Sequence, residues 1–132
     1  MFFSKFLIKK YKINLKNILG HSDVAPERKK DPGEKFPWQY LSQNKVGLWH
    51  TIKKQELIKN RRIKTTKVDK DLFINNLFKI GYQKKLPGAL SVNKYINYII
   101  KAFQRRYRQN LIDGKIDQEC LIISQNLIKA YH

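Results

Sequence analysis

Apolar residues in the C-terminal half of the chain recur every three or four positions, the spacing of a helix face. One series follows Ser91, a residue type that can begin a helix, and comprises Val92, Tyr95, Ile96, Ile99, Phe103 and Tyr107. An earlier series follows Asp69, which can cap a helix, and comprises Leu72, Phe73, Leu77 and Ile80 before Gly81. The two series predict two amphipathic helices.

A third helix is predicted after the Asp113-Gly114 turn. Asp117 can cap this helix, and Glu119 in its first turn suits the positive end of the helix dipole. Its apolar side is formed by Cys120, Ile123, Leu127 and Tyr131. Three amphipathic helices with short connections predict an all-α three-helix bundle over residues 65–132.

The N-terminal half has a different pattern. Residues 3–12 predict a short helix, and Ile18-Leu19 reads as the end of a strand. Proline and glycine interrupt residues 20–49, where 38–41 can hold one or two helical turns. Residues 53–67 are highly charged and show no clear apolar period, so we expect a linker there and a domain boundary near residue 65. We expect an α+β unit over residues 1–64 and a mostly helical chain overall.

The net charge of this chain is extreme for its length. Its 132 residues include 28 Lys and Arg against 10 Asp and Glu, a formal charge of +18. Such a balance predicts attraction to polyanions: nucleic acid, anionic lipid, or a wall polymer that carries carboxylates. An AT-rich coding sequence is the alternative origin of the charge, because Lys, Asn and Ile are over-used together.

The number of cysteines and the length of the apolar runs exclude several kinds of site and segment. Cys120 is the only cysteine, so an internal disulfide and a Cys-x-x-Cys zinc site are both excluded, and we expect a buried, unreactive thiol. No apolar run approaches the roughly 18–20 residues that a membrane-spanning helix needs. The first ten residues have too short an apolar part for a normal signal peptide and fit an amphipathic helix better.

Candidate chemistry is concentrated between His21 and Asp31. Imidazole and carboxylate are good ligands for zinc, although a catalytic zinc normally takes three protein ligands and a water. The ten-residue spacing requires the loop to fold back, and the prolines within it reduce the entropy lost on ordering. Lys29 or Lys30 near such a metal could stabilise an oxyanion. On spacing alone, ordinary surface or turn chemistry is the competing interpretation of this pair.

The amino-acid sequence of this segment resembles that of a known protein family. Residues 20–33 read GHSDVAPERKKDPG, and FPW at 36–38 and GLW at 47–49 follow. They resemble the zinc-dependent N-acetylmuramoyl-L-alanine amidases of the AmpD/AmiD group. Gly81-Tyr82, the AFQRRYR stretch at 102–108, and Asp113-Gly114 with Asp117 are similar to the three-helix peptidoglycan-binding module of AmiD-like members.

The resemblance implies roles for three residues. His21 and Asp31 match the second and third zinc ligands of the family, and Lys29 matches the lysine thought to stabilise the tetrahedral intermediate. The family hydrolyses the amide bond between N-acetylmuramic acid and L-alanine, so zinc is the implied metal and peptidoglycan or muropeptides are the implied partners. Full-length AmiD-like relatives work in the cell envelope, and the location of this chain is left open.

The family pattern is incomplete in this chain. The first zinc-ligating histidine and the acidic residue for water activation lie upstream of the matching segment in the family. His50 and His132 do not occupy the place of that histidine, and neither Glu27 nor Glu34 matches that acid. We therefore expect the last third of an amidase domain followed by the wall-binding module, inactive on its own.

Two aromatic and three basic residues have open interpretations at this point. Trp38 and Trp49 either line a sugar-binding cleft or fill a core. Arg105, Arg106 and Arg108 either contact wall carboxylates or form a solvated helix face. The same arginines and the +18 charge support an alternative function, a basic helical nucleic-acid-binding module, although no groove-reading motif is present.

Overall fold

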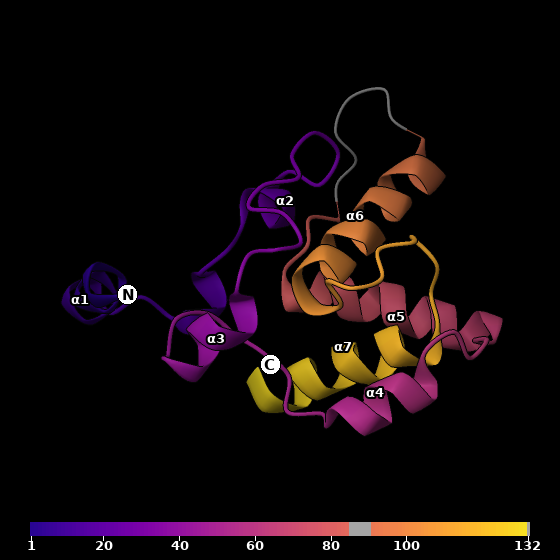
Figure 1. Cartoon of the computed structure of the whole chain (residues 1–132). Helices are drawn as coiled ribbons and strands as arrows, with labels where there is room; N and C mark the ends of the chain where they lie inside the picture. The colour runs from indigo at the N-terminus through magenta and orange to yellow at the C-terminus, as the bar shows by residue number, and fades with distance from the viewer. Residues whose placement is uncertain (85–90, 132) are drawn as a thin grey trace.

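Helices are the only regular secondary structure in the part of the chain that the structure describes. The structure is a computed structural model, and it describes residues 1–84 and 91–131. Figure 1 shows the elements in chain order. They are α1 (Phe2–Tyr11), the short 3-10 helix η1 (Leu15–Asn17), α2 (His21–Val24), α3 (Trp38–Gln43), α4 (Lys54–Asn60), α5 (Lys67–Ile80), α6 (Val92–Tyr107) and α7 (Gln118–Tyr131).

The three predicted C-terminal helices are confirmed as α5, α6 and α7. Ser91 caps α6, because its hydroxyl accepts a hydrogen bond from the amide of Lys94 at 3.3 Å. Asp117 likewise accepts one from the amide of Cys120 at 3.0 Å. The cap of α5 is Thr66 and not Asp69, which forms the second half of a capping box by accepting from the Thr66 amide at 3.1 Å.

A continuous apolar core joins these helices, and α4 packs beside α7 (Figure 1). Phe73 of α5 meets Phe103 of α6 edge to face, with ring centroids 5.1 Å apart. The thiol of Cys120 is fully buried, and burial raises its pKa to about 12, which confirms the prediction of a buried thiol. Tyr131 departs from the predicted apolar side, since it is 41% exposed.

The expected α+β character of residues 1–64 is wrong. The described residues contain no strand, and the bridge between Lys64 and Asp117 is isolated. The backbone at Ile18 is extended as the sequence suggests, but its carbonyl accepts a hydrogen bond from the side chain of Arg106 at 3.0 Å. A strand is stable only when neighbouring strands pair its backbone groups, and no neighbouring strand is found among the described residues.

The charged segment over residues 53–67 contains a helix where we expected a linker. Its helix, α4, is followed by Arg61, whose guanidinium donates two hydrogen bonds to Glu119 on α7 at 2.6 and 2.8 Å. The side chain of Leu57 packs against the bundle core. The domain boundary near residue 65 stays a prediction.

The predicted N-terminal helix is confirmed as α1, but it has no buried residue. Its aromatic side chains lie in solvent, with Phe2 86% exposed. No helix in the described ranges has the length and apolar character that crossing a membrane requires.

Candidate metal centre

The structure brings His21 and Asp31 together. Nδ1 of His21 lies 3.0 Å from Oδ2 of Asp31, and the two side chains are 55% and 63% exposed. His21 is the first residue of α2, and Asp31 lies where the following loop returns to it. The amide of Ser22 donates a hydrogen bond to the carbonyl of Asp31 at 2.9 Å, which fixes the backbone of the loop beside the helix.

The spacing of these atoms fits a zinc site. Two ligands of a tetrahedral zinc, each bound at about 2.0–2.1 Å, lie about 3.3 Å apart. The 3.0 Å separation of imidazole nitrogen and carboxylate oxygen therefore needs little adjustment to admit a metal. The part of the chain that the structure describes holds no group of three His, Cys, Asp or Glu residues able to bind one. His21 and Asp31 are spaced as two of the ligands of such a site would be.

The electrostatic environment favours the ionised form of Asp31. Desolvation raises the pKa of this carboxyl group, but the hydrogen bond to His21 and the charges of His21 and Lys29 outweigh it, so the pKa lies below its usual value. A carboxylate that stays ionised is the form that binds a metal. Lys29 is half-buried on the same loop, and its amide donates to the carbonyl of Ala25 at 2.9 Å.

A second carboxylate of the motif, Asp23, holds the loop to the helical bundle. Oδ1 of Asp23 accepts a hydrogen bond from the hydroxyl of Tyr82 at 2.7 Å. Oδ2 accepts from the amide of Gly20 at 2.9 Å and from Nη1 of Arg106 at 2.8 Å. Burial, and next the charge of Asp23, raise the pKa of Tyr82 well above 10, so its hydroxyl remains a donor.

Arg106, on helix α6, also holds the loop in place. Its guanidinium lies 3.8 Å from the ring centroid of Trp38, donates to the carbonyl of Ile18 and pairs with Asp23. The side chain is 3% exposed. Trp38 is buried against it, which supports the core interpretation of this tryptophan. We name Asp23, Tyr82, Arg106 and Trp38 the loop anchor.

Of the two interpretations of the three arginines, the solvated helix face is wrong. Arg105, Arg106 and Arg108 are all buried, and Arg108 pairs with Asp113 and Asp117. One signal in the sequence could have placed Arg106: it follows Phe103 by three residues and Ile99 by seven, so it lies beside the apolar stripe. For Asp23, the signal was a second carboxylate inside the motif, two residues after His21.

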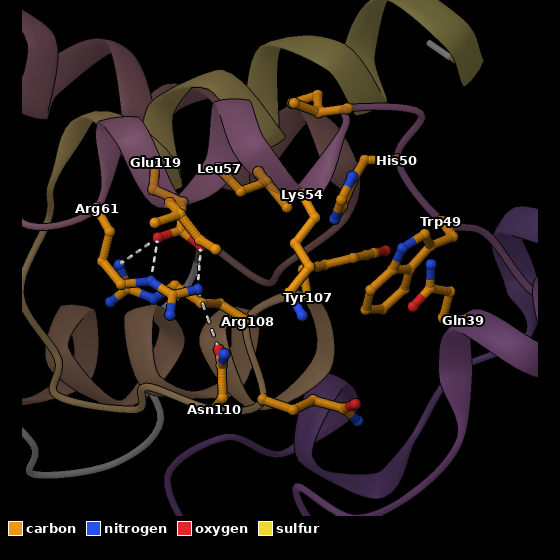
Figure 2. A pocket seen from close by; sticks show the side chains of 13 residues that line it. Gln39, Trp49, His50, Lys54, Leu57, Arg61, Tyr107, Arg108, Asn110 and Glu119 are labelled. Atoms are coloured by element: carbon orange, nitrogen blue, oxygen red, sulfur yellow. Dashed lines mark hydrogen bonds and ion pairs between the residues drawn. The ribbon is translucent and has the colours of Figure 1, made fainter.

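His50 lines a different cavity from His21 and Asp31. Figure 2 shows this cavity, of about 360 Å³, with Trp49 and Tyr107 on one side and the Arg61–Glu119 ion pair on the other. The ring of Trp49 stacks on His50 with centroids 4.9 Å apart. Burial lowers the pKa of His50 to about 4, and neither ring nitrogen has a partner among the described residues. His132 lies outside the described residues.

The His21–Asp31 pair adjoins a hollow at the surface. An apolar hollow of about 490 Å³ adjoins both residues; it is lined also by Leu19, Gly20, Val24, Pro32, Phe36 and Trp38. The loop and α6 also line a basic groove, which includes Asp31 but not His21. A substrate can therefore reach the pair from solvent.

Comparison with known proteins identifies relatives over nearly the whole chain. No family model matches. The chain is 34% identical over 128 residues to N-acetylmuramoyl-L-alanine amidase AmiD of Escherichia coli K12. The aligned region covers 97% of this chain and 45% of AmiD. A 32-residue stretch is 59% identical to 1,6-anhydro-N-acetylmuramyl-L-alanine amidase AmpD of Enterobacter cloacae, covering 24% of this chain and 17% of that protein.

Solved structures agree with this result. A complex of Escherichia coli AmiD with the substrate anhydro-N-acetylmuramic acid-L-Ala-D-γ-Glu-L-Lys superposes with a TM-score of 0.80 at 33% identity, covering 98% of this chain and 49% of that one. AmpDH3 from Pseudomonas aeruginosa, in complex with anhydromuramic pentapeptide, superposes with a TM-score of 0.74 at 29% identity, covering 98% and 50%.

Sequence and fold together place the chain among relatives of the peptidoglycan amidases. More specifically, it is related to the N-acetylmuramoyl-L-alanine amidases of the AmpD and AmiD type, and it spans about half the length of AmiD. Nothing in the comparisons supports the nucleic-acid alternative, and two arginines that suggested it, Arg106 and Arg108, are engaged in buried ion pairs.

Proposed function

We propose that this chain contributes part of the zinc site and part of the muropeptide-binding surface of an N-acetylmuramoyl-L-alanine amidase. The family reaction is hydrolysis of the amide bond between N-acetylmuramic acid and L-alanine. The proposal rests on the 3.0 Å approach of His21 to Asp31 within the motif that resembles the family. The similarity to AmiD over 97% of the chain supports it.

The roles we assign follow from the chemistry of each group. A bound zinc would lower the pKa of its water and polarise the scissile carbonyl. His21 and Asp31 would hold the metal through nitrogen and oxygen donors. Lys29, on the same loop, would balance negative charge on the oxygen of the attacked carbonyl through its ammonium group. The loop anchor fixes these residues, because a site performs well only when its supporting shell is rigid.

Amide hydrolysis needs more than these residues supply. Zinc held by two protein ligands binds more weakly than zinc held by three. The described residues contain no third ligand beside His21 and Asp31. We infer that this chain alone binds zinc weakly and does not hydrolyse the amide bond, and that the remaining ligand and the base come from elsewhere.

Muropeptide or peptidoglycan is the partner we propose for the helical bundle formed by α5, α6 and α7. The bundle resembles the wall-binding module of AmiD-like proteins, and the loop anchor ties it directly to the metal centre through Arg106 and Tyr82. A ligand bound across the bundle and the loop would therefore contact one connected surface.

Zinc titration of the purified chain tests the metal centre. We expect one zinc per chain, bound in competition with a weak chromophoric chelator, and about tenfold or greater weakening in His21→Ala and in Asp31→Ala. Asp71→Ala, which removes an exposed carboxylate from α5, is the matched control and should leave the affinity unchanged. Equal zinc affinity in all four proteins would contradict the assignment of His21 and Asp31.

Sedimentation with insoluble peptidoglycan tests the partner. We expect the chain to pellet with peptidoglycan at a salt concentration that releases it from DNA, because phosphate contacts weaken steeply with salt. Release of muropeptides by the zinc-loaded chain alone would contradict the inference that it is inactive. Retention on DNA but not on peptidoglycan would contradict the proposed partner.

A further inference from the structure

A basic groove of about 730 Å³ is lined by the loop after α2 and by helix α6. Helix α2 itself packs against α6, and Figure 1 shows the two side by side. The loop side is formed by residues 26–31. On α6, the lining residues Tyr98, Lys101 and Arg105 follow one another at the spacing of a single helix face, and Ile112 lies beyond them. The groove shares Asp31 and Lys29 with the metal centre.

The charges that line this groove are unbalanced. Five cationic side chains face two carboxylates, and both carboxylates are already paired within the chain. Glu27 accepts from Arg28 at 3.2 Å, and Asp31 contacts His21. The remaining cations have no ion pair with another described residue: Lys29, Lys30, Lys101 and Arg105. The groove is therefore set up to attract an anion.

Arg105 is the most informative of these cations, because it is buried and has no carboxylate partner among the residues that the structure describes. Its side chain belongs to a residue only 9% exposed, yet it forms no ion pair or side-chain hydrogen bond with another described residue. The buried arginines beside it, Arg106 and Arg108, both pair with carboxylates. A guanidinium with little exposed surface and no carboxylate beside it can gain an anionic partner from a ligand, and Arg105 lines the groove where such a ligand would lie.

Carboxylate is the anion that fits both the groove and the proposed function. A guanidinium matches a carboxylate with two parallel hydrogen bonds. The muropeptide in the AmiD complex carries two free carboxylates, one on the α-carbon of its γ-linked glutamate and one at its terminal lysine. We propose that this groove binds the free carboxylates of the stem peptide, with Arg105 as the buried anchor and Lys30 and Lys101 as flanking charges. This inference rests on the proposed function.

Isothermal titration with two matched ligands tests the inference. The first is anhydro-N-acetylmuramic acid-L-Ala-D-γ-Glu-L-Lys, and the second is the same molecule with both free carboxylates converted to carboxamides. We expect the acid to bind the intact chain at least about tenfold more tightly than the diamide. Arg105→Met should remove this preference without weakening diamide binding, and Arg105→Lys should retain part of it, because lysine keeps the charge but loses the two-pronged geometry.

A second variant keeps the test independent of folding. Lys30→Met combined with Lys101→Met alters exposed or half-buried lysines and should weaken acid binding about threefold. Lys129→Met, on the exposed part of α7, should change nothing. Far-ultraviolet circular dichroism establishes whether each variant is folded. If Arg105→Met does not fold, the proposal is tested by two other measurements. These are the preference of the intact chain for the acid over the diamide and the binding of the acid to the double lysine variant.

The possible outcomes distinguish the groove proposal from the proposed function. Equal binding of acid and diamide, with no effect of the lysine variants, overturns the groove proposal but leaves muropeptide binding standing. Absence of binding to either ligand overturns both proposals. Inorganic phosphate that binds as tightly as the acid, with the same dependence on Arg105, would identify a general anion site and overturn the assignment to peptide carboxylates.

Discussion

The C-terminal bundle and the N-terminal loop region are held together by different forces. The bundle buries a continuous apolar core over α5, α6 and α7. The region before Gly47 leaves large apolar side chains in solvent, among them Phe2, Phe3, Leu19 and Val24. Its order around the metal centre depends on the loop anchor, a polar connection to the bundle. The candidate site is therefore held in place by residues of the helical bundle that are distant in sequence.

Phe103→Ala should give the largest effect, because it removes the centre of the bundle core. We expect a loss of about 4 kcal/mol in the free energy of unfolding, measured by urea denaturation. Phe3→Ala, on the exposed α1, is the matched control and should change stability by less than about 0.5 kcal/mol. Similar losses in both variants would remove the distinction between the two regions.

Asp23→Ala should rank next, because it leaves the buried guanidinium of Arg106 without its carboxylate. We expect a loss of about 3 kcal/mol, since breaking a buried ion pair from one side is strongly destabilising. Arg106→Met combined with Asp23→Ala should recover part of the loss, and this coupling is measured by a double-mutant cycle. Additive losses would show that the two residues act independently.

Lowering the pH should destabilise the fold through His50. Its pKa is about 4 in the folded chain and 6.5 in its ordinary state, so between these values the unfolded chain binds the extra proton. Stability is therefore complete above pH 6.5 and falls as the pH drops toward 4. From pH 7 to pH 5 the loss from this residue is about 2 kcal/mol. In His50→Phe, this part of the difference between the two pH values should disappear.

Thr66→Ala should have the smallest effect, because it removes only the capping hydroxyl of α5. We expect a loss of about 1 kcal/mol in the free energy of unfolding, since the amide of Asp69 loses its acceptor. Thr66→Ser, which keeps the hydroxyl, should be nearly neutral in the same denaturation experiment. A loss of equal size in Thr66→Ser would place the effect elsewhere than in the cap.

The bundle was predictable because its signals are local. The apolar spacing at Ile99, Phe103, Ile123 and Leu127 fixes which helix faces meet, and Ser91 provides a cap that depends on its own neighbours. The proximity of His21 and Asp31 was predictable for another reason: the motif around them resembles that of a known family. No geometric rule for a ten-residue loop would have placed the two side chains 3.0 Å apart.

The loop anchor was not predictable from the same signals, because it joins residues far apart in sequence. Asp23 and Arg106 are 83 positions apart, and neither segment by itself indicates that it contacts the other. The expected strand at Ile18-Leu19 failed similarly, since extended backbone forms a strand only with a partner. A side chain of α6 meets that backbone instead.

Asp23 also limits how the loop that carries His21 and Asp31 can be transplanted. A designer who moved Gly20–Pro32 to a new scaffold would carry along a carboxylate that needs a phenol and a guanidinium from elsewhere in space. The recipient fold would have to supply both, at hydrogen-bonding distance and shielded from solvent. A transplanted loop would thus need the motif and also Tyr82 and Arg106, the partners of Asp23. The length of the motif does not show how many residues have to be moved.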